Sequence, residues 1–198
     1  MQFEEATSVN ARDSKALVFE ERLSVAPLGG GGAFTRSTDA EVLRLTSCTI
    51  EPDMFSNILR KTKLTELRLQ NVSCKGNGHL RCLNELPSLK LLEINKCPDL
   101  TDRYASPLMN LKLERLIWGV KELTKRDVGL LNASEAEISL IYYSPSSMND
   151  LCMGMFSEIE RLRELTFVDF GDSAFPAGVT SLTHLTQLTF KGGRLAAS

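Results

Sequence analysis

Four residues of metal-binding type lie close together in the sequence: Cys74, His79, Cys82 and Cys97. Thiolates and imidazoles are the ligands that structural zinc takes in proteins. The spacing C-x4-H-x2-C-x14-C is not a familiar zinc pattern, and Cys74 and Cys97 also have a place in a repeat described below. The sequence therefore favours packing roles for these cysteines and predicts neither a metal nor another cofactor.

Other candidate chemistry is weaker still. The four glycines at residues 29–32 could form a backbone nest for an anion. They continue into Ala33, however, and not into the Gly-Lys-Ser or Gly-Lys-Thr that ends a phosphate loop, so a flexible connection is favoured. The two histidines, His79 and His184, lie in no recognisable Ser/His/Asp or Cys/His motif. The sequence does not predict an enzyme.

Composition excludes several further classes of protein. The chain has 198 residues, 42% of them hydrophobic and 24% charged, which predicts a globular protein with its own core. A formal net charge of −2 gives no reason to expect a nucleic-acid partner. Residues 1–10 do not resemble a secretory signal, and no apolar run approaches the roughly 18 residues that span a bilayer. Five cysteines, an odd count, fit a reducing cytoplasm better than a disulfide framework.

The dominant feature is a repeated pattern, seen most clearly in residues 89–100, which read L-x-x-L-x-I-x-x-C-x-x-L. We number the first Leu as position one. Positions four and six are spaced by two, which is the period of a strand, so both side chains point to one face of that strand. Position nine, often Asn or Cys, falls where the chain turns away from the sheet. A small side chain suits this turn, because the turn must be packed and its backbone polar groups must find hydrogen-bond partners. This is the pattern of a leucine-rich repeat.

Seven stretches fit the pattern. Their first positions are residues 40, 64, 89, 113, 135, 162 and 185. The spacings of 24, 25, 24, 22, 27 and 23 residues all lie within the roughly 20–29 residues of this repeat. The fifth is degenerate, with Glu135 at position one, so its register is uncertain. A lone strand cannot bury its leucines, whereas stacked units form a parallel sheet with a continuous core on one side.

The expected fold is therefore an α/β leucine-rich-repeat solenoid, an arc or horseshoe. A parallel sheet would line its concave face, and short helices or turns would line its convex face. We expect seven repeats in residues 40–198, preceded in residues 1–39 by a polar cap or a degenerate repeat with a Gly-rich connection. Helical spacing of apolar residues predicts helices at residues 52–61 and 151–162. Residues 80–86 and 177–182 are predicted to form single turns.

Two columns of side chains should point outward from the concave face, at positions five and seven. Charged residues occupy the first repeats, and an apolar group with one aromatic residue occupies the fourth to sixth. Such a group is typical of a protein-binding hot spot, although a neighbouring loop could also cover it. The candidate partner-binding residues are Arg44, Arg68, Glu93, Ile117, Ile141, Tyr142 and Val168.

Residues 86–100, LPSLKLLEINKCPDL, resemble the repeat units of plant intracellular immune receptors, the nucleotide-binding leucine-rich-repeat disease-resistance proteins of the coiled-coil class. Residues 175–188 are similar to a second unit type of the same family. The resemblance covers about residues 40–198 and implies a cytosolic, non-catalytic recognition module of plant defence. The implied partner is a pathogen effector, a guarded host protein or the receptor's own nucleotide-binding module. The nucleotide-binding motif itself is absent, which favours a fragment or a truncated relative.

Another class also fits the repeats. Cys97 followed by Leu100, Thr101 and Asp102 resembles the cysteine-containing repeats of ubiquitin-ligase substrate adaptors, so a cytosolic scaffold or adaptor is the alternative. No F-box-like segment precedes the repeats. An extracellular plant receptor would show L-x-G-x-I-P motifs and paired capping cysteines, and neither is present.

Overall fold

A computed structural model describes residues 16–20, 40–50, 63–74, 83, 86–98, 111–143, 150–169 and 177–192 of the chain. The predicted helix at 52–61, the glycines at 29–32 and the side chains of Cys74, His79 and Cys82 lie outside these residues. Of the turn predicted at 80–86, only Leu83 and Leu86 are described, and Leu86 N donates to Leu83 O (2.9 Å). Within them, no helix has the length and apolar character needed to cross a bilayer.

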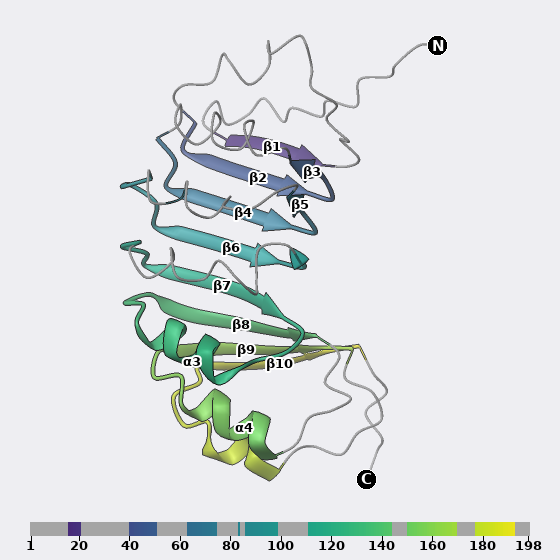
Figure 1. The fold of residues 1–198 in the computed structure, drawn as a ribbon, viewed down its shortest axis with the longest axis vertical. Helices are drawn as coiled ribbons and strands as arrows, with labels where there is room; N and C mark the ends of the chain where they lie inside the picture. The colour runs from purple at the N-terminus through teal and green to yellow at the C-terminus, as the bar shows by residue number, and fades with distance from the viewer. Residues whose placement is uncertain are drawn as a thin grey trace.

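The described part of the chain contains one open, all-parallel sheet of eight strands. The parallel arrangement is as the sequence predicts, but seven strands were expected, and the additional one, β1, precedes the predicted repeats. The strands follow one another in chain order along the longest dimension of the molecule (Figure 1). They are β1 (Ala16–Glu20), β2 (Val42–Thr46), β4 (Glu66–Gln70), β6 (Leu91–Asn95), β7 (Arg115–Val120), β8 (Glu137–Tyr143), β9 (Leu162–Val168) and β10 (Gln187–Lys191). Two short strands, β3 (Thr49–Ile50) and β5 (Ser73–Cys74), pair separately.

The core lies on one side of this sheet because apolar side chains alternate with polar ones along each strand. Core-facing leucines stack from strand to strand, as in Leu43 beside Leu67 and Leu67 beside Leu92. All three have 0% of their surface exposed. We call the opposite side of the sheet, which carries Arg44, Arg68 and Glu93, the open face.

Helices α3 (Lys125–Asn132) and α4 (Asp150–Ser157) and the 3-10 helix η4 (Ala177–Ser181) lie near the C-terminal strands (Figure 1). They cover the core face with buried residues such as Val128, Leu131 and Phe156. The helix predicted at 151–162 is confirmed only to Ser157, because the following residues turn into β9. Helix α3 was not predicted, although the capping box formed by Thr124 and Asp127 marks its start.

A left-handed turn recurs at one position of the repeat. Position eight has positive φ in five units, at Ser47 (53°), Asn71 (54°), Lys96 (52°), Asp169 (58°) and Gly192 (74°). Positive φ is uncommon outside glycine, so its recurrence directly after successive strands marks a common way of leaving the sheet. The turn is tied to the neighbouring unit: Ser47 N donates to Gln70 O (2.9 Å), and Asn71 N donates to Asn95 O (2.8 Å).

Position nine is buried after the turns of the second and third repeats and half-buried, at Cys48, after the turn of the first. Val72 has 0% and Cys97 has 1% of its surface exposed. The Sγ atom of Cys97 lies 3.2 Å from Asn95 O and 3.5 Å from Leu69 O. Cys97 therefore fills the turn and meets the carbonyl groups at the ends of two strands.

The repeat is irregular at β7 and β8, which run for six and seven residues without the left-handed turn. The predicted register places Ile138 beside Leu165, which is wrong. Leu165 and Phe167 pair with Leu140 and Tyr142, and a register shift lies between Ile138 and Ser139. Strand β8 has three core-facing apolar residues and pairs all of them on both sides. On β7 their partners are Leu116, Trp118 and Val120. On β9 the shift supplies three matching apolar residues, Leu162, Leu165 and Phe167.

Asn132, the last residue of α3, connects this helix to the segment between α4 and β9. Its Nδ2 donates to Glu158 O (2.7 Å), and its Oδ1 accepts from Glu160 N (3.1 Å). We expect Asn132→Ala to lower the free energy of unfolding by about 1–2 kcal/mol, because two backbone groups lose a partner. Urea unfolding measures this change. The control Arg126→Ala, at an exposed position on α3, should change it by less than about 0.5 kcal/mol. Equal effects of the two substitutions would show that the Asn132 bridge carries no stability.

Candidate interaction surface

Six of the seven residues predicted to bind a partner lie on the open face. Arg44, Arg68, Glu93 and Ile117 are neighbours on four successive strands. Ile141 and Val168 follow on β8 and β9. The seventh, Tyr142, is a correction: only 3% of its surface is exposed, and its ring packs edge-to-face on Phe156 and Phe167 in the core. It follows Ile141 directly, so strand alternation places it on the opposite face.

A ladder of ion pairs crosses the first three of these strands. Glu66 Oε1 accepts from Arg44 Nη2 (3.0 Å) and from Arg68 Nε (2.7 Å), and Arg68 Nη1 lies 3.1 Å from Glu93 Oε2. Burial tends to raise the carboxyl pKa of Glu66, but the hydrogen bonds and charges of Arg68 and Arg44 outweigh it. The pKa of Glu66 therefore lies below its ordinary value. The ladder holds two positive and two negative charges and is balanced within itself.

A second polar cluster spans β7, β8 and β9. Arg115 Nη2 reaches across β8 to Glu164 Oε2 (2.6 Å). Between them, Ser139 Oγ accepts from Arg115 Nη2 (3.2 Å) and donates to Glu164 Oε2 (3.0 Å). The register shift makes this possible, because it places Glu164, and not the predicted Thr166, beside Ser139. This cluster is also balanced in charge, because it holds one positive charge, on Arg115, and one negative charge, on Glu164.

Between the two charged groups lies an apolar set of four residues, each half-buried: Leu91, Ile117, Ile141 and Val168. They face away from the core and are not among the apolar side chains that pack against it in the described part of the chain. The prediction missed Leu91 because it considered only positions five and seven of the repeat. Position three also points to the open face, and the strand period was the signal that could have found it.

Tyr143 is the aromatic residue that the open face does carry. Its hydroxyl donates to Asn95 Oδ1, two strands away, so that its ring crosses Gly119 on the strand between. Lys96 Nζ lies 5.1 Å from the ring centroid, within the range of a cation–π contact. Only 7% of the surface of Tyr143 and of Asn95 is exposed. Together, Asn95, Gly119 and Tyr143 form a closely packed patch beside Ile117 and Ile141.

The environment of Tyr143 predicts a dependence of stability on pH. Burial raises the pKa of the Tyr143 phenol above its ordinary value; the hydrogen bond with Asn95 opposes this rise, and the negative charges of Glu93 and Asp169 add to it. The unfolded chain therefore loses this proton at lower pH than the folded chain does. The free energy of unfolding should fall as the pH rises above about 10, through the raised pKa. Urea unfolding at about pH 9 and about pH 11 measures this, and Tyr143→Phe should reduce the fall; an unchanged fall would contradict the assignment.

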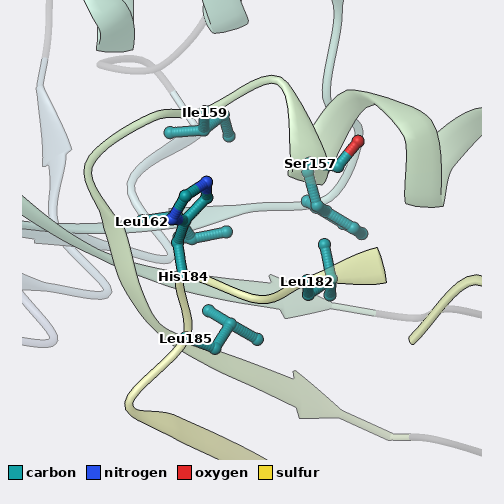
Figure 2. A pocket seen from close by; sticks show the side chains of 7 residues that line it. Ser157, Ile159, Leu162, Leu182, His184 and Leu185 are labelled. Carbon is teal, nitrogen blue, oxygen red and sulfur yellow. The ribbon is translucent and has the colours of Figure 1, made fainter. Parts of the chain in front are cut away.

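A small apolar hollow with a volume of about 10 Å³, open to solvent, lies at the end of α4 beside the turn before β10. Its lining includes Ile159, Leu162, Leu182 and Leu185, with His184 among them (Figure 2). His184 is the only titratable residue of this lining, and Ser157 Oγ donates to Gly154 O (2.7 Å). The lining residues thus present no nucleophile paired with a base. Elsewhere in the described ranges, no three His, Cys, Asp or Glu side chains gather as a metal site would require.

Comparison of the chain with protein-family models and with curated proteins gives no match. Inference about its role therefore rests on the open face itself and on the repeat pattern.

Proposed function

We propose that this chain is a leucine-rich-repeat solenoid that binds another protein through its open face. The repeat pattern, the pairing of equivalent leucines on successive strands and the recurrent left-handed turn at position eight support the solenoid. Such arrays commonly use the extended sheet surface for binding.

The observation that carries the binding proposal is the apolar set on the open face. Leu91, Ile117, Ile141 and Val168 remain partly exposed on a face whose other side chains are mostly polar. The ladder of ion pairs on β2, β4 and β6 borders them on one side, and the Arg115–Glu164 pair borders them on the other; neither group has a net charge. An apolar centre with a polar rim is the usual composition of a protein-binding surface, in which a few central residues supply most of the binding energy.

We further propose that the module belongs to plant defence, as the recognition part of an intracellular disease-resistance receptor. The support is the resemblance of residues 86–100 to the repeat units of those receptors. On this proposal the chain works in the cytoplasm. Its partner is a pathogen effector, a guarded host protein or the receptor's own nucleotide-binding module.

The test compares Ile117→Asp and Ile141→Asp with Gln70→Asp, a matched change at an exposed position on the same face. Proteins bound to each tagged variant in cells of the source organism are quantified, and thermal unfolding is followed by circular dichroism. We expect both isoleucine variants to fold and to lose the main partner by roughly tenfold or more, whereas Gln70→Asp keeps it.

Two outcomes would contradict the proposal. Retention of every partner by both isoleucine variants would remove the open face from recognition. Loss of cooperative unfolding in the isoleucine variants would show that these side chains belong to the core. Recovery of a ubiquitin-ligase subunit as the main partner would keep the binding face but assign the chain to the adaptor class.

A further inference from the structure

The four apolar residues of the open face form a diagonal row. Leu91 pairs with Arg115, and Ile117 lies two residues beyond Arg115 on the same strand. Ile117 pairs with Ser139, two residues before Ile141, and Ile141 pairs with Thr166, two residues before Val168. Each step therefore moves one strand across the sheet and two residues along it. We call this row of Leu91, Ile117, Ile141 and Val168 the apolar stripe.

The spacing of the stripe can be stated from strand geometry. Diagonal neighbours of this kind are roughly 7–8 Å apart, so three steps cover roughly 21–24 Å. Alternate side chains of an extended peptide repeat at about 6.8 Å and cover about 20 Å in three steps. Side chains on one face of a helix, at i, i+4, i+7 and i+11, cover only about 16 Å. An extended segment fits the stripe better than a helix does.

The rows on either side of the stripe are parallel to it. One consists of Glu93, Gly119 and Tyr143, and the Tyr143 ring crosses Gly119 to form a wall along the stripe. The other begins with Arg115 and Ser139, which are bound to each other and to Glu164. The charged groups of both rows already have partners on the same face, so a ligand gains little by bringing a charge of its own.

We propose that the apolar stripe binds an extended segment of a partner protein with apolar side chains at alternate positions and no marked charge. This inference rests on the proposed function and names the chemistry of the partner. The apolar side chains of the segment lie along Leu91, Ile117, Ile141 and Val168. Its intervening side chains point to solvent, and Tyr143 limits its position on one side.

The probe is a phage-displayed library of random linear peptides of about 12 residues, long enough to cross the stripe in extended form. The library is selected on the full chain and counter-selected on the Ile117→Asp/Ile141→Asp double variant. We expect the enriched peptides to carry apolar residues at i, i+2 and i+4. Synthetic copies should keep their affinity within about twofold between low and high salt and should tolerate proline between the apolar positions.

Single substitutions then test the ends of the stripe. Leu91→Asp and Val168→Asp should each weaken the peptides by about fivefold or more, whereas Gln70→Asp should not. Peptides with apolar residues at i, i+3 and i+7, or with strongly salt-dependent affinity, would overturn the extended and uncharged partner. They would leave protein binding by the open face intact. A library that yields no peptide dependent on Ile117 and Ile141 would overturn the inference, while the native-partner assay above decides the proposed function.

Discussion

Phe167→Ala is expected to lower the free energy of unfolding by about 3–5 kcal/mol, the largest effect we predict for a single substitution. Phe167 has 0% of its surface exposed. Its ring centroid lies 5.9 Å from that of Phe156 on α4, 6.2 Å from that of Tyr142 on β8 and 5.2 Å from that of Phe190 on β10. The residue thus holds three elements together, and alanine would leave a cavity that they cannot all close.

Urea unfolding of the purified chain measures this effect. The neighbouring Thr166→Ala, on the open face of the same strand, should cost less than about 1 kcal/mol and serves as the control. A loss below about 1 kcal/mol for Phe167→Ala would mean that the aromatic cluster does not carry the C-terminal half of the sheet.

Gly119→Ala is expected to destabilise the protein by about 2 kcal/mol, although alanine is usually the better residue in a strand. A Cβ atom at this position would lie 2.6 Å from Asn95 Oδ1, 3.1 Å from Asn95 Cα and 3.1 Å from Tyr143 Cε2. The contact with Asn95 Cα involves the backbone and cannot be relieved by a side-chain rotation alone. The Tyr143–Asn95 hydrogen bond should therefore break.

The matched control is Gly129→Ala on helix α3, where an added Cβ has nothing within 4 Å. There the same substitution should stabilise the protein by about 0.5–1 kcal/mol, because alanine favours the helix. Stabilisation by both substitutions would show that Tyr143 and Asn95 do not pack over Gly119.

The sequence predicts much of the sheet because its signal is local and repeated. Leu67 and Leu69 lie at the spacing of one strand, and equivalent pairs recur every 22 to 27 residues, which is enough to place the strands in parallel order. Where the repeat is regular, as from Arg44 to Ile117, the predicted neighbours on the open face are confirmed.

The prediction fails where tertiary packing overrides the template. No local pattern indicates the register shift that places Glu164, and not Thr166, beside Ser139. Tyr142 is a different case: it directly follows Ile141, and applying the strand alternation beyond position seven would have placed it on the core face. The contact between Tyr143 and Asn95 spans 48 residues and depends on the absence of a side chain at Gly119. The left-handed turns at Ser47, Asn71, Lys96 and Asp169 have no common residue type that would reveal them. The register shift and the Tyr143–Asn95 contact therefore give the open face features that a regular repeat sequence does not predict.

The most direct test of the central claim, that the open face binds a protein, is site-specific photo-cross-linking. A photoreactive amino acid replaces Ile141 on the open face or, as the control, Lys125 at an exposed position on α3. Both proteins are irradiated in cells of the source organism. Our account predicts a discrete protein adduct from position 141 that is lost when Ile117→Asp is also present, and no such adduct from position 125. An adduct from position 125 alone, or one from position 141 that survives Ile117→Asp, would contradict it.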